Sequence, residues 1–102
     1  MISPQELNSI NQETIDKIIN EIDTEMKETH GWYPWEEAVI TGEYPDEVMN
    51  AICKLYYEVG WTYIYWDRSS EQGERPGLSG FKFSTTPIDE TYVKEMHQYS
   101  PI

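Results

Sequence analysis

The stretch GWTYIYWDR, residues 60–68, decides the fold of this chain. Four of its nine side chains are aromatic, and successive side chains of a strand point to opposite faces. On that pattern Tyr63 and Tyr65 share one face, while Ile64 and Trp66 share the other. One face is therefore expected to pack in the core beneath helices. The other face is either covered by the WYPW segment, residues 32–35, or exposed for binding.

The neighbouring segments supply a second strand and a helix. GFKFST, residues 80–85, predicts a strand with Phe81 and Phe83 on one face. The thirteen residues between the strands, 67–79, are long for a hairpin loop, which is typical of a mobile or functional segment. Residues 45–59 predict a helix with a broad apolar stripe, ended by Gly60. The stripe runs through Val48, Ile52, Leu55 and Val59 and is widened by Met49, Cys53 and Tyr56.

The first thirty residues predict a long amphipathic helix. SPQE, residues 3–6, is a capping box in which Ser3 and Glu6 satisfy each other's amides. Apolar residues recur at three- and four-residue spacing as far as Met26, and Gly31 fits a left-handed cap. The opposite face of this helix carries acids that two lysines offset in part: Glu13, Asp16, Glu21, Asp23, Glu25 and Glu28.

Two further segments complete the predicted fold. Residues 34–41 fit either a short helix after Pro34 or a strand over Ala38 to Thr41. Residues 86–100 predict a helix capped by Thr86, with Ile88, Tyr92, Met96 and Tyr99 buried. The expected class is α+β: a short antiparallel hairpin packed against two or three helices. Because a two-stranded sheet is rarely stable alone, a third strand would come from residues 38–41 or from another subunit. We expect residues 1–102 to form a single compact acidic domain.

Charge and cysteine content restrict the function. Nineteen acids against seven bases give a net charge of −12, and thirteen of the acids lie in residues 1–60. Direct binding to nucleic acid or to an anionic membrane is therefore disfavoured, and a basic protein surface is favoured, although such charge also serves solubility. The single cysteine, Cys53, cannot form an internal disulfide, and no signal peptide or membrane-length apolar run is visible. A cytoplasmic setting is expected.

The sequence lacks the usual motifs of enzymes and metal sites. His30 and His97 are far apart, and no zinc, calcium, phosphate-loop or nucleophile-elbow pattern is present. Cys53 lies on the apolar stripe of a helix, which predicts a buried and inert thiol. We expect no catalysis, no metal and no cofactor.

Three kinds of binding remain as hypotheses. In the preferred one, helix acids and exposed aromatic side chains occlude a basic protein, and the carboxylates could imitate duplex phosphates spaced about 1.7 Å apart along the axis. These residues are Asp16, Glu21, Asp23, Glu28, Trp32, Trp35 and Tyr65. In the second, a nucleotide-like ligand binds to Trp66, Arg68 and Arg75. In the third, the chain is a structural subunit that assembles as a homo-oligomer.

Residues 46–84 present a helix, the pair GW, an aromatic strand, a charged loop and the strand GFKFS. This order resembles a helix–GW–β-hairpin segment of small uncharacterised bacteriophage accessory proteins. The resemblance covers less than half of the chain, contains no catalytic motif and transfers no functional residue. It implies an accessory factor that binds and redirects a host or defence protein.

Overall fold

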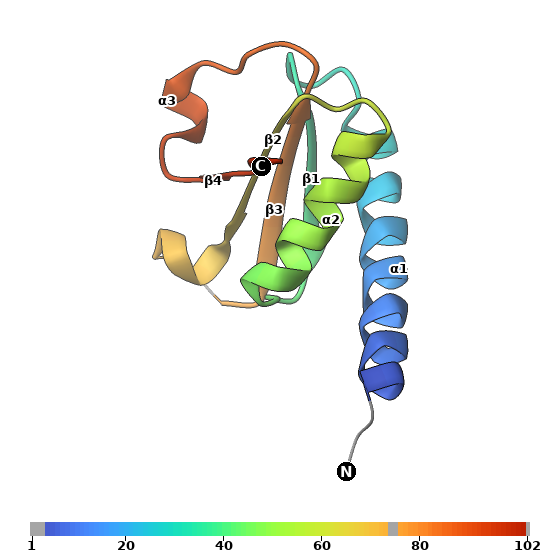
Figure 1. Ribbon diagram of the computed structural model, residues 1–102. Helices are drawn as coiled ribbons and strands as arrows, with labels where there is room; N and C mark the ends of the chain where they lie inside the picture. The colour runs from blue at the N-terminus through green and yellow to red at the C-terminus, as the bar shows by residue number, and fades with distance from the viewer. Residues whose placement is uncertain (1–3, 74–75, 102) are drawn as a thin grey trace.

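The computed structural model describes residues 4–73 and 76–101, with the side chains of the first helix described from Gln12 onward. A four-stranded antiparallel sheet in the order β1-β3-β2-β4 lies beside the helices (Figure 1). The predicted α+β class is confirmed. The elements are α1 (Pro4–Thr29), β1 (Glu36–Thr41), α2 (Asp46–Glu58), β2 (Tyr63–Arg68), the 3-10 turn η1 (Ser69–Gln72), β3 (Leu78–Ser84), α3 (Glu90–Val93) and β4 (His97–Gln98).

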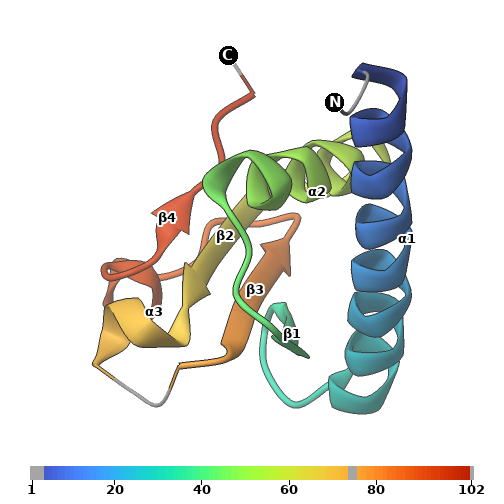
Figure 2. The ribbon, with the colours of Figure 1, turned by 90° about the horizontal axis from the view of Figure 1, so that it is seen from below.

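The segment with two predicted alternatives is a strand, so the hairpin gains its third strand from within the chain. β1 pairs with β3 so that Ala38 lies opposite Phe81, and β2 pairs with β3 so that Ile64 lies opposite Phe83. Figure 2 shows the strands side by side, with α1 next to β1 at one edge and β4 at the other. Ser3 of the predicted capping box lies outside the described residues.

The core lies between the sheet and the two long helices. Ile18 and Ile22 of α1 meet α2 and the core face of the sheet, where Phe81 and Phe83 are fully buried. The buried face of α2 is Met49, Ile52, Cys53 and Tyr56. The predicted apolar stripe was wrong as a guide to burial at Leu55 and Val59, which are 39% and 76% exposed. Period alone gives the apolar arc of a helix, whereas its packing against α1 and the sheet decides which part of that arc is buried.

Strand β2 buries both of its faces. Trp66 belongs to the core, at 3% exposure, while Tyr65 on the opposite face is 8% exposed. That opposite face is covered from the side where α3 lies in Figure 1. Trp35 takes part in this cover, because the ammonium group of Lys82 in β3 lies 5.4 Å from its ring centre and Tyr92 of α3 contacts it. The second face was predicted to be either covered or exposed for binding. At Tyr65 it is covered.

The predicted C-terminal helix is wrong except for one turn. Asp89, rather than Thr86, caps α3 by accepting a hydrogen bond from the amide of Thr91 at 2.8 Å. The chain then forms β4 beside β2, and the amide of Tyr99 donates to the carbonyl of Ile64 at 2.8 Å. The open edge of β2 has backbone groups that need partners, and satisfying them prevails over the local helical period.

Candidate functional site

The acids of α1 divide between two sides of the helix. Glu21 accepts a hydrogen bond from the amide of Thr41 at 3.4 Å, on the outer edge of β1. Asp23 instead accepts from the hydroxyl of Tyr56 in α2 at 2.7 Å. Asp16 and Glu28 are exposed. The prediction of one acidic face therefore needs correction, because Glu21 and Asp23 contact different elements.

Two of these acids protect the sheet. Glu25 accepts from the amide of Val39, next to the Glu21 contact, and the hydroxyl of Thr29 donates to the carbonyl of Glu37 at 2.7 Å. Burial, followed by the hydrogen bond and the charge of Glu28, raises the pKa of Glu25. Side chains of α1 thereby occupy backbone groups along β1 that would otherwise be open to another strand. Glu21 and Glu25 thus have a structural role that the sequence pattern does not indicate.

The aromatic candidates also separate into exposed and buried residues. Trp32 is 68% exposed, as a binding role requires, but Trp35 and Tyr65 are each 8% exposed. The expectation that Trp35 and Tyr65 lie on the surface is therefore wrong. Trp35, just before β1, lies against the rings of Tyr33 and Tyr92. Tyr65 is buried on the sheet face that also carries Lys82, so alternation along a strand does not by itself expose a side chain.

Exposed rings gather over the buried Trp35. Tyr33 stacks on the indole of Trp35 at 5.3 Å between ring centres, and Tyr92 contacts the same indole at 5.1 Å. Trp32 is exposed next to Tyr33 in the chain, and we call Trp32, Tyr33 and Tyr92 the aromatic patch; Tyr33 and Tyr92 are 43% and 59% exposed. The buried indole N–H of Trp35 has no hydrogen-bond partner among the described residues. Sequence periodicity assigned Tyr92 to a buried helix face, so the patch is visible in the structure and not in the pattern.

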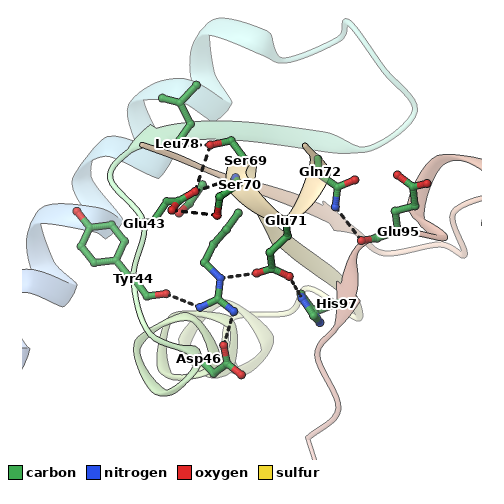
Figure 3. A network of polar contacts seen from close by, with 12 residues as sticks. Glu43, Tyr44, Asp46, Ser69, Ser70, Glu71, Gln72, Leu78, Glu95 and His97 are labelled. Atoms are coloured by element: carbon green, nitrogen blue, oxygen red, sulfur yellow. Dashed lines mark hydrogen bonds and ion pairs between the residues drawn. The ribbon is translucent and has the colours of Figure 1, made fainter. Parts of the chain in front are cut away.

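Arg68, a candidate for nucleotide binding, is held inside the protein. Its guanidinium donates to the carbonyl of Tyr44 at 2.8 Å and to Asp46 at 2.5 Å, and it pairs with Glu71 (Figure 3). It also lies 5.0 Å from the ring centre of Trp66. The hydrogen bond with Glu71 is the largest cause that raises the pKa of Arg68.

These contacts link the end of β2 to the start of α2, which is a structural role. Trp66 is buried in the core, so it is not a ligand platform. Arg75 lies outside the described residues. The donors of Arg68 already face acceptors of the protein, so this side chain does not support the predicted nucleotide site.

The same network orders the start of the connection between β2 and β3. Glu71 also pairs with Nε2 of His97 in β4 at 2.6 Å, and the His97 ring stacks on Trp66 at 4.3 Å between centres. The hydrogen bonds with His97 and then Arg68 lower the pKa of Glu71. Glu43 accepts from the amide of Ser70 at 2.9 Å, and this contact is the largest cause that lowers the pKa of Glu43 (Figure 3). The described part of this long connection is thus a hydrogen-bonded 3-10 turn.

Two of the basic side chains are taken up in ion pairs with carboxylates of the fold. Lys82 forms an ion pair with Glu37 and lies over the ring of Trp35, and Arg68 forms ion pairs with Asp46 and Glu71. Both cationic side chains are about four-fifths buried, at 16% and 21% exposure. Four lysines, Lys17, Lys27, Lys54 and Lys94, are exposed. The outward charge is consequently dominated by carboxylates.

Three features of the described residues concern metal binding, membrane insertion and thiol chemistry. No group of three or more His, Cys, Asp or Glu side chains within 4–73 and 76–101 is arranged to hold a metal ion. In the same part of the chain, no helix combines the length and the apolarity that a bilayer crossing requires. Cys53 is buried, as predicted, and burial raises the pKa of its thiol to about 12.

No protein-family model matches this chain, and neither a curated protein nor a solved structure matches it. Function is therefore inferred from the chemistry of the side chains described above.

Proposed function

We propose that this protein is a non-catalytic acidic module that binds a basic protein and occludes its working surface, as a phage-type inhibitor would in the bacterial cytoplasm. The observation that carries the proposal is the aromatic patch. Trp32, Tyr33 and Tyr92 are all exposed, on a chain whose net charge is −12. Large exposed rings in a strongly acidic setting suit a partner whose surface combines arginine or lysine with apolar groups.

The rings and the acids contribute in different ways. Tyrosine and tryptophan bring large, rigid contact area, and they are enriched among the residues that dominate binding energy. The negative field accelerates encounter with a basic partner and opposes wrong partners. A target that handles nucleic acid or takes part in defence would have the required basic surface.

The geometry favours local contacts over imitation of a DNA duplex by α1. A duplex mimic needs a continuous row of carboxylates, whereas Glu21 is bound to β1 and Asp23 to α2. Asp16, Asp23 and Glu28 are exposed, and we assign these acids of α1 to the partner, although Asp23 also holds the hydroxyl of Tyr56. Self-assembly is opposed by the charge of the chain, because two copies would bring two surfaces of the same sign together.

The test is affinity capture of partners from a bacterial lysate, first at low salt and then at high salt, with identification by mass spectrometry. We expect the wild-type protein to retain a basic protein that high salt releases, and Trp32→Ser to retain much less of it. Leu78→Ser is the matched control, because Leu78 is 43% exposed and pairs with Thr41 at the end of the sheet away from Glu36.

Either of two results would overturn this function. One is capture of no basic protein at low salt. The other is equal retention by the wild-type protein, Trp32→Ser and Tyr33→Ser, since the rings would then contribute nothing. Light scattering on the purified protein shows separately whether copies of the chain assemble with one another.

A further inference from the structure

A second apolar surface lies where the C-terminal end of α2 meets α1 (Figure 2). A groove of about 330 Å³ is lined by Ile19 and Asp23 of α1 and by Leu55, Tyr56 and Glu58 of α2, with Val59 directly after. The side chains of Ile19, Leu55 and Val59 are apolar, and Val59 is 76% exposed. Leu55 and Val59, the part of the predicted α2 stripe that is not buried in the core, therefore face the groove.

The groove has negative charge at its rim. Asp23 stands on the α1 side and holds the hydroxyl of Tyr56 at the wall, while Glu58 stands at the C-terminal end of α2. A helix C-terminus carries the negative end of the macrodipole and is stabilised there by a cation. The last turn of α2 contains no basic residue, and Glu58 adds a further negative charge. The nearest base along α2 is Lys54, one turn before Glu58, so the last turn itself departs from this local rule, as functional positions often do.

The backbone of the groove walls restricts what can enter. The α1 wall is mid-helix, so its backbone groups are bonded within the helix. At the end of α2 the carbonyls of Tyr56 and Tyr57 accept from the amides that follow the helix, so this wall also offers no regular ladder to an extended strand. A segment that docks here must satisfy its own backbone, as a helix does. Its apolar side chains would fill the space beside Leu55 and Val59, and its cations would meet Asp23 and Glu58.

Resting on the function proposed above, we infer that this groove receives an amphipathic helix of the partner, with an apolar side chain flanked by lysine or arginine. Charge complementarity selects this occupant over a second copy of the chain, which carries the same −12 charge as the groove it would enter. The aromatic patch and the groove are then two contact surfaces for one basic partner.

The experiment uses a fluorescent synthetic helix of leucine and lysine with one apolar face, and a lysine-only peptide of equal charge. Anisotropy titration of the full chain should give at least about tenfold tighter binding of the amphipathic helix, since burying an apolar side chain is worth that much. The key variant is Val59→Asp, which removes apolar surface and adds a negative charge. We expect it to weaken binding of the helix about tenfold, whereas attraction by charge alone would leave binding unchanged or tighter.

The matched control is Leu78→Asp, which makes the same kind of change at an exposed residue far along the sheet. Circular dichroism melting shows whether each variant is folded, and Leu55→Gln replaces Val59→Asp if that variant unfolds. NMR amide shifts should change most at Ile19, Leu55 and Val59.

Three results overturn the groove: no binding of the helix, equal binding of the two peptides, or equal effects of the two aspartate variants. None of these results affects a basic protein captured through Trp32, so the proposed function and this inference can fail separately.

Discussion

Removing the Arg68 side chain as Arg68→Met tests whether that residue is a structural link or a ligand contact. The bond to the carbonyl of Tyr44 at 2.8 Å is worth about 1 kcal/mol. The ion pairs with Asp46 and Glu71 involve part-exposed carboxylates and add about 0.2–1 kcal/mol each. The guanidinium 5.0 Å from the Trp66 ring centre adds about 0.5–1 kcal/mol. Arg68→Met should therefore lower the free energy of unfolding by about 2–4 kcal/mol.

The assay is urea unfolding followed by the fluorescence of the four tryptophans, with thermal melting as a second measurement. A loss of this size corresponds to a drop in Tm of about 10–20 °C for a chain of this length. Lys54→Met is the control, because it removes one positive charge from an exposed position on α2. Arg68→Lys should recover less than half of the loss, because an ammonium group cannot make the forked contacts. If Arg68→Met and Lys54→Met agree within about 0.5 kcal/mol, the structural role is refuted and a ligand role becomes tenable.

Two further predictions follow from individual contacts. Because hydrogen bonds with His97 and Arg68 lower the folded pKa of Glu71, its contribution to stability is full above the unfolded value of about 4.3 and is lost as pH falls through the folded pKa. Urea unfolding between pH 7 and pH 3 should therefore show a steeper loss for the wild-type protein than for Glu71→Gln, and parallel curves would contradict this. Glu25→Ala should free the amide of Val39 at the β1 edge and increase association in light scattering, while Asp16→Ala, which removes the same charge from an exposed position, should not. Equal scattering by the two variants would show that α1 does not protect this edge.

The parts that the sequence predicted are those with a short local period. Alternation of side chains gave β2 and β3 and put Phe81 and Phe83 on one face, which the structure shows to be buried. Three- and four-residue spacing gave α1 and α2, and Gly31 adopts the left-handed conformation (φ 89) expected after α1. Residues close in the chain determine such patterns, because helix and strand each repeat within a few residues.

Contacts between distant residues decided the rest. The edge of β1 is protected by Glu21 from a position twenty residues earlier, and His97 reaches Glu71 across twenty-six residues. Neither contact follows from the periodic pattern of the sequence. The acids of α1 therefore could not be told apart in the sequence, although the fold gives them different partners. The same holds for the candidate site. The sequence identified acids and rings as its chemistry, but which of them remain exposed depends on where α3, β4 and α2 pack, since burial is a property of neighbours brought together by the whole chain.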